Sequence, residues 1–199
     1  EVFLCHAAAV DGGALMRLVS ARLSPGNDAL SGVRRLLDAT PAQSGGRLHF
    51  GCRIAFDRDG FLYLSTGERN ERNRAQRLDD LGGKVLRLTR DGRVPPDNPF
   101  VGQPGARPEI WSFGHRHPQG LALNPWTGSL WDSEFGPRGG DEINIIRRGA
   151  NYGWPIVSHG REYWGPRISS EVTAPGITDP IHVWVPSVSP SGIAFYDGV

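Results

Sequence analysis

Short runs of aliphatic and aromatic residues recur along the chain, and residues typical of turns separate them. Such runs predict β-strands. We expect strands at residues 61–65, 84–89, 109–113, 120–124, 129–132 and 142–146. Between or after them, the pairs Asp59-Gly60, Asp91-Gly92, Thr127-Gly128 and Asp197-Gly198 supply residues that accept positive φ in tight hairpins. The main candidate for a helix is residues 27–38, where leucine and valine fall at helical spacing although Gly32 interrupts it. The pattern predicts an all-β chain built from hairpins.

One sequence pattern occurs three times along the chain. A small or polar residue, an apolar-Ala-apolar strand and a turn with glycine follow one another around Ile54, Leu121 and Ile193. Hairpins that repeat at long, regular intervals are typical of a β-propeller, in which each blade is a four-stranded sheet. The alternative is a coincidence between unrelated hairpins in a glycine-rich β protein.

The length of the chain limits how many blades it can contain. At roughly 70 residues per repeat, 199 residues supply about three blades, whereas closed propellers have about four to eight. The chain also begins without Met and stops just after a turn. We therefore expect residues 1–199 to form a single incomplete propeller domain whose N- and C-terminal blades are missing, as a fragment of a longer protein.

Composition and charge exclude several classes of function. The chain has 22 basic and 21 acidic residues, and this balance predicts neither a nucleic-acid partner nor attraction to a membrane surface. No run approaches the ~20 apolar residues of a membrane span. Cys5 and Cys52 are too few for a disulfide framework, so we interpret them as two unpaired small apolar residues that do not reveal the redox compartment.

Three groups of residues are candidates for chemistry. The first is His49, because a neutral imidazole can accept a proton from a hydroxyl near neutral pH, although a structural histidine is the alternative. The second follows at Arg116, His117 and Gln119. Arginine presents a planar fork of donors that suits carboxylates or a developing oxyanion. His115 and His117 also leave a transition-metal site open, whereas the arginine-rich residues 68–77 are interpreted as a solvated loop.

The third group lies in residues 134–144, where acidic side chains surround glycine and proline turns. Carboxylates and exposed backbone carbonyls are the hard oxygen ligands that calcium requires. The spacing is not that of an EF-hand loop. A solvated acidic turn and a calcium site both fit this pattern when it is taken alone.

The order of these groups resembles a known family. The motifs are H-F-G-x-R, L-G-G-K-V-L-R-L-T-R-D-G-x-V-P-x-D-N-P-F, E-I-W-S-F-G-H-R-x-P-Q-G, G-P-R-G-G-D-E-I-N, G-x-N-Y-G-W-P and P-S-V-S-P-S-G, and they run from about Arg47 to Tyr196. Together they resemble the soluble pyrroloquinoline quinone (PQQ) dependent sugar dehydrogenases, the glucose/sorbosone dehydrogenase family, and within it the aldose sugar dehydrogenase branch.

The resemblance implies a six-bladed β-propeller that holds PQQ and calcium above its central channel. His49 matches the general base that takes the proton of the sugar's anomeric hydroxyl while hydride passes to the quinone. Arg116 matches a cofactor contact that also stabilises charge on the reduced cofactor. The further positions that match cofactor contacts are His117, Gln119 and Ser187.

The resemblance also implies two calcium sites, an electron acceptor and a compartment. The backbone carbonyls of Gly136 and Pro137 match ligands of the calcium that binds PQQ, and Glu142 and Tyr152 match a second, structural site. The implied partners are an aldose sugar and an external electron acceptor, either a quinone or a redox protein. The implied location is the periplasm or the cell exterior.

Three positions depart from the family pattern. Cys52 stands where glycine is usual, so backbone strain is expected if that position needs positive φ. His117 replaces the usual asparagine, and Phe135 occupies a position that is polar in some relatives. The basic residues that grip PQQ from later blades would lie beyond Val199, so the chain alone is not expected to be active. A calcium-dependent lactonase-type propeller and a non-catalytic carbohydrate-binding propeller remain as alternatives.

Overall fold

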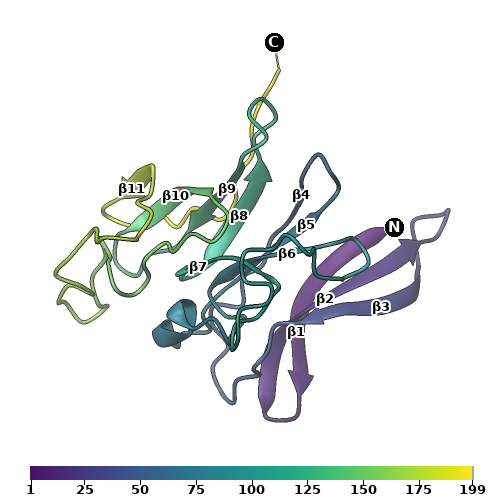
Figure 1. Ribbon diagram of the computed structural model, residues 1–199, viewed down its shortest axis with the longest axis horizontal. Coiled ribbons are helices and arrows are strands. Elements are labelled where there is room, and N and C mark those ends of the chain that lie inside the picture. Colours follow the sequence, from purple (N-terminus) through teal and green to yellow (C-terminus); the bar gives the residue numbers. More distant parts are fainter. Residues whose placement is uncertain (199) are drawn as a thin grey trace.

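The computed structural model of the protein describes residues 1–198, which form three antiparallel sheets (Figure 1). The first sheet contains β1 (Val2–Val10), β2 (Gly13–Leu23) and β3 (Leu30–Asp38). The second contains β4 (Ile54–Phe56), β5 (Leu62–Thr66), β6 (Lys84–Leu88) and β7 (Ile110–Phe113), with a short 3-10 helix, η1 (Arg72–Gln76), between β5 and β6. The third contains β8 (Pro118–Leu123), β9 (Leu130–Glu134), β10 (Asp141–Ile146) and β11 (His182–Trp184). The expected all-β segment of about three blades is confirmed.

The strand predictions are confirmed and the helix prediction is wrong. The six predicted runs correspond to β5 to β10, and Gly60, Gly92 and Gly128 take positive φ in the turns. The segment predicted as a helix contains β3 instead, which pairs with β2 through most of its length. Its helical spacing of leucine and valine does not define a buried face, because Leu30 and Val33 remain exposed. Pairing with β2 satisfies the backbone that a helix would have satisfied internally.

Two of the three repeated patterns begin a sheet. Ile54 opens β4 and Leu121 lies in β8, the first strand of the third sheet. Ile193 lies outside any strand of residues 1–198, but its backbone runs beside β8, because a Cβ added at Gly120 would lie 2.8 Å from the Ile193 nitrogen. The repeat therefore marks where successive sheets start.

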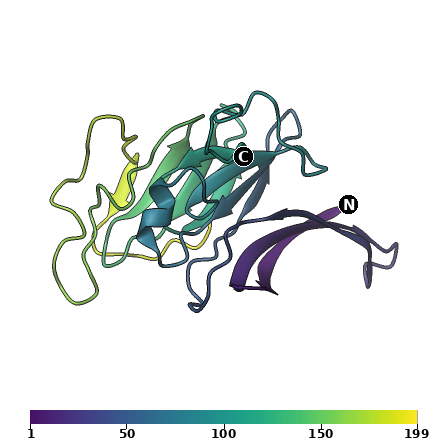
Figure 2. The ribbon, with the colours of Figure 1, turned by 60° about the horizontal axis from the view of Figure 1, so that its bottom comes forward.

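The middle sheet joins its neighbours through two apolar cores. Alternate residues of a strand point to opposite faces of the sheet, so Leu62 and Leu64 of β5 pack toward the first sheet while Tyr63 packs toward the third. The first core includes Met16 and Leu18 of β2. The second includes Leu121, Leu130 and Ile146. Figure 2 shows the three sheets side by side in chain order, from purple to green. Within residues 1–198, no helix is long and apolar enough to cross a membrane.

The interpretation of the two cysteines as unpaired is wrong. Cys5 of β1 and Cys52, just before β4, form a disulfide with a Cα–Cα distance of 6.6 Å. The folded contact between the first and second sheets brings them together, and their separation of 47 residues gives no pattern from which to predict it. Cys52 does not take positive φ, so the strain expected for a side chain at this position does not arise.

Candidate functional site

His49 lies in the loop before β4 and is held by a buried carboxylate. Its Nδ1 lies 2.5 Å from Oε1 of Glu68, and the two side chains are 12% and 1% exposed. Because a carboxylate accepts hydrogen bonds, Nδ1 carries the proton and Nε2 is left as a proton acceptor. The backbone approaches closely here: a Cβ at Gly67 would overlap the carbonyl oxygen of His49.

The segment interpreted as a solvated loop is solvated only in part, which corrects that interpretation: residues 70–73 and 77 are exposed, whereas Glu68, Arg69 and Arg74 are buried. Glu68, Arg69 and Arg74 are each less than 5% exposed. The guanidinium of Arg69 donates to the carbonyls of Leu48, Ala14 and Gly46. A sequence suggests that polar residues in a turn-rich segment are solvated. Their partners here are backbone carbonyls from other parts of the chain, which come near only when the chain folds.

His117 stacks on His49 and is held neutral. The two rings lie 4.6 Å apart between centroids, and the Gln119 amide donates to Nε2 of His117 at 2.6 Å. Burial, together with the nearby His49 and Arg116, lowers the pKa of His117 to about 3. The structure thus brings together three of the predicted site residues in one contact chain: His49, His117 and Gln119.

Arg116 connects this histidine pair to the glycine-rich turn after β9. Its backbone N–H donates to Oε2 of Glu134 at 2.7 Å. Its Nη1 donates to the carbonyls of Phe135 and Gly136 at 3.0 and 3.2 Å. The Nε atom is buried without a hydrogen-bond partner, so the guanidinium keeps a donor for a further group.

A cleft of about 230 Å³ opens beside Arg116. Its lining residues are Glu68, Asn70, Arg72, Arg116, Pro137, Trp154, Glu162 and Tyr163. Arg72 and Glu162 form an ion pair of 2.8 Å across it. The guanidinium groups of Arg72 and Arg116 both lie within 6 Å of the Trp154 ring. Arg72 is paired with Glu162, so Arg116 and the flat Trp154 wall are the features that suit a planar anionic ligand.

The predicted calcium turn and Ser187 meet at Asp141. One oxygen of Asp141 accepts from the Gly136 N–H at 2.8 Å. The other accepts from the Ser187 hydroxyl and from the backbone N–H groups of Val188 and Ser189, each at 2.7 Å. Asp141 therefore fixes the Gly136 turn relative to the segment after β11.

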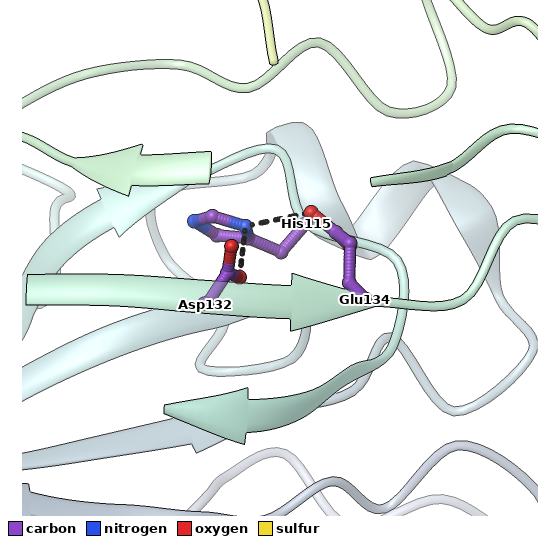
Figure 3. A group of neighbouring side chains, drawn as sticks. All are labelled: His115, Asp132 and Glu134. Carbon is purple, nitrogen blue, oxygen red and sulfur yellow. Dashed lines mark hydrogen bonds and ion pairs between the residues drawn. The ribbon is translucent and has the colours of Figure 1, made fainter. Parts of the chain in front are cut away.

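Several acidic side chains are buried together between β9 and β10. Figure 3 shows the carboxylates of Asp132 and Glu134 pointing at Nδ1 of His115, at 3.6 and 3.1 Å. Glu134 pairs in register with Glu142, and Asp132 pairs with Asn144, so all four side chains lie on neighbouring positions of the two strands. Both carboxylate oxygens of Asp132 are buried without a hydrogen-bond partner.

This cluster borders a small cavity of about 10 Å³, enough for one water-sized particle. Its lining includes Glu134, Gly136, Glu142 and Tyr152. Burial, and next the charge of Glu134, raise the pKa values of Asp132 and Glu142 well above the ordinary carboxyl range. The Tyr152 hydroxyl donates to Ile145 and accepts from Arg147, which leaves its backbone carbonyl as the available ligand.

Sequence reasoning missed two carboxylates that organise the site. Glu68 was assigned to a solvated loop, and Asp132 was not considered as a functional residue. Each is less than 2% exposed. The available signal was position, because Asp132 stands in the middle of β9 and Glu68 stands two residues after the end of β5. Burial of a charge at such a position requires a partner.

The chain is similar to known proteins over almost its whole length. The family model described as Glucose / Sorbosone dehydrogenase matches residues 1–199. The curated aldose sugar dehydrogenase YliI of Escherichia coli is 46% identical over 190 residues, which cover 94% of this chain and 51% of that protein. The crystal structure of the soluble Escherichia coli aldose sugar dehydrogenase in the apo form is similar with a TM-score of 0.95 and 43% identity, covering 98% of this chain and 57% of that one.

A ligand-bound structure is also similar. The PQQ-bound form of aldose sugar dehydrogenase from Streptomyces coelicolor matches with a TM-score of 0.73 and 34% identity, covering 97% of this chain and 52% of that one. The chain therefore spans about half the length of the relatives it matches.

Proposed function

The chain belongs to the glucose/sorbosone dehydrogenase family, and from this premise we propose that the whole protein oxidises an aldose sugar to a lactone, using PQQ and calcium. The observation that carries the proposal is the pair His49 and Glu68, because it leaves Nε2 of a buried histidine as a proton acceptor while Glu68 lines the cleft. The electrons would leave through an external acceptor, a quinone or a redox protein.

His49 would act as the general base. Oxidation of a cyclic aldose removes a proton from the anomeric hydroxyl and a hydride from the anomeric carbon, and the product is a lactone. Nε2 would take the proton, and Glu68 would stabilise the imidazolium that forms. His117, neutral and stacked on His49, would add bulk beside the base without adding a competing positive charge.

Arg116 and its surroundings fit a planar, anionic cofactor. PQQ, when bound, supplies a quinone that accepts two electrons as hydride. The Arg116 guanidinium and the Trp154 wall, both in the lining, support its binding in the cleft. Gln119 and His117 would contact it from the β8 side, and Ser187 from the segment after β11.

The acidic turn fits calcium. Gly136 and Pro137 would offer backbone carbonyls to the ion that binds with PQQ, while Arg116 Nη1 already uses one lone pair of the Gly136 carbonyl. Glu142 and the Tyr152 carbonyl would hold a second ion in the small cavity. Hard oxygen ligands and uncompensated carboxylates are the donor set that calcium prefers.

The disulfide supports a location outside the cytoplasm. Disulfides persist in oxidising compartments such as the periplasm or the cell exterior. The Cys5–Cys52 bond is consistent with that location for this protein.

Replacement of the proposed base tests the reaction. In the full-length protein supplied with PQQ and calcium, His49→Ala should lower the turnover of dye reduction with glucose roughly 10²- to 10⁴-fold, because one general base contributes about that much. His6→Ala, at an exposed histidine of β1, serves as the control and should retain full turnover. Near wild-type turnover in His49→Ala would rule out this mechanism. Calcium-dependent hydrolysis of lactones without quinone reduction would instead support the lactonase alternative.

A further inference from the structure

The loop that carries His49 has little regular structure to hold it. Residues 47–53 contain no strand, and His49 and Gly51 take φ of +51° and +81°. Backbone hydrogen bonds hold the loop on one side: the Gly67 N–H donates to Phe50, and the Arg69 N–H donates to His49, each at 3.2 Å. At the end of the loop, the Ser65 N–H of β5 donates to Arg53 at 3.0 Å. On the side that faces the first sheet, the Arg69 guanidinium donates to Leu48 and to Ala14 of β2.

The disulfide supplies a covalent contact on that side. Cys52 lies three residues after His49 and is bonded to Cys5 in the middle of β1. Cys5 pairs in register with Leu18, which is fully buried in the first apolar core. Both cysteines pack against that core. The bond therefore ties the loop to a rigid and well-packed part of the first sheet.

Rigid placement matters for the proposed chemistry. A general base must lie within hydrogen-bond reach of the proton that it removes, and a displacement of about 1 Å can cost on the order of 10²-fold in rate. Glu68 fixes the orientation of the His49 ring through Nδ1. It does not contact Cys52, whose side chain the disulfide joins to β1.

We infer that the Cys5–Cys52 disulfide is a positioning element for His49, so that breaking it loosens residues 47–53 and slows sugar oxidation while cofactor binding persists. Only the predicted change in turnover rests on the proposed function; the predicted change in the loop does not. Arg116 and the Gly136 turn lie on the side of the site formed by the third sheet, and the disulfide does not contact them. Cofactor binding there should therefore not depend on the disulfide. A disulfide that merely stabilised the first sheet would leave the loop and the rate unchanged in folded protein.

Hydrogen exchange of the full-length protein tests the structural half without any measurement of activity. Dithiothreitol breaks the sulfur–sulfur bond and forms two protein thiols, while its own two thiols become a cyclic disulfide. Amides of residues 47–53 should then exchange roughly 10-fold faster, with β8 to β10 unchanged, as expected for a local opening. The variant Cys5→Ser/Cys52→Ser should show the faster exchange without reductant and should not respond to it.

Two outcomes would overturn this half of the inference. One is unchanged exchange in residues 47–53 after titration has shown that two thiols were released. The other is the finding of two free thiols in the denatured protein before any reductant is added.

The turnover of sugar oxidation tests the second half of the inference, that the disulfide positions His49. With PQQ and calcium, the folded double serine variant should lose about 10- to 100-fold in turnover with glucose. Its dissociation constant for PQQ should remain within about twofold of wild type. Unchanged turnover together with faster loop exchange would disprove positioning and leave the proposed function intact. Full activity of His49→Ala would instead disprove the proposed function, and the exchange result would still decide whether the disulfide holds the loop.

Discussion

At the scale of single residues, His117 gives the site a pH dependence with a definite sign. Its pKa is lowered to about 3, first by burial and then by His49 and Arg116, whereas the unfolded value is about 6.5. Between these values the unfolded chain binds a proton that the folded protein excludes. The free energy of unfolding therefore rises with pH across this window, by at most about 1.4 kcal/mol per pH unit from this residue.

Replacement of His117 by asparagine removes that titration. We expect the slope of unfolding free energy against pH, measured by urea unfolding between about pH 4 and 6, to be flatter in His117→Asn than in wild type. Asparagine is too short to replace the Nε2 acceptor of the 2.6 Å contact with the Gln119 amide, so the slopes are compared rather than the absolute stabilities. His182→Asn is the matched control, because His182 is exposed at the start of β11, and it should keep the wild-type slope. Equal slopes in His117→Asn and wild type would show that His117 protonates normally.

At the scale of elements, β9 and β10 bring together carboxyl groups whose ionised forms call for a cation beside them. Glu134 faces Glu142 across the pair, and Asp132 has no hydrogen-bond partner for either oxygen. Carboxylates that ionise close together repel strongly, and Nδ1 of His115 lies 3.6 Å from Asp132 and 3.1 Å from Glu134. A calcium ion in the adjoining cavity would offset this repulsion and thereby stabilise the pair of strands.

Calcium should therefore stabilise the protein through Glu142. Calcium at about 100 times its dissociation constant should raise the free energy of unfolding by roughly 2.7 kcal/mol. This corresponds to a rise in Tm of about 5–10 °C for a domain of this size. We expect chelation to reverse the rise and Glu142→Gln to reduce it substantially, in scans made without PQQ. Glu171→Gln, at an exposed acidic position, should respond as wild type does. If Glu142→Gln keeps the full calcium-dependent rise in Tm, Glu142 is not a ligand of the ion.

The elements also show what the sequence could and could not predict. Strands β5 to β10 were predictable because their apolar runs are bounded by Gly turns, a purely local signal. β3 was not predictable, because its leucines and valine also fall at helical spacing and because Leu30 and Val33 remain exposed, so the segment shows no apolar face typical of a strand. The motifs predicted His49, Arg116 and Gly136, and the structure brings their neighbourhoods together. Glu68 and the disulfide escaped prediction because each depends on a contact between distant segments.

At the scale of the whole molecule, the first sheet is attached to the second in two different ways. The apolar core joins Met16 and Leu18 of β2 to Leu62 and Leu64 of β5. The disulfide joins β1 to the start of the second sheet and closes a loop with a sequence separation of 47 residues. The core acts in the folded state, whereas the disulfide also restricts the unfolded chain. Their contributions to stability can therefore be separated.

Loss of the disulfide should lower the free energy of unfolding by about 4 kcal/mol, the value that the chain-entropy model gives for a loop of this length. Urea unfolding of the full-length double serine variant against oxidised wild type measures it, and reduced wild type should match the variant. Ala7→Ser, an exposed change on the same strand, controls for added hydroxyl groups and should shift stability by less than about 0.5 kcal/mol. A loss below about 1 kcal/mol would mean that the apolar core alone keeps the first sheet in place.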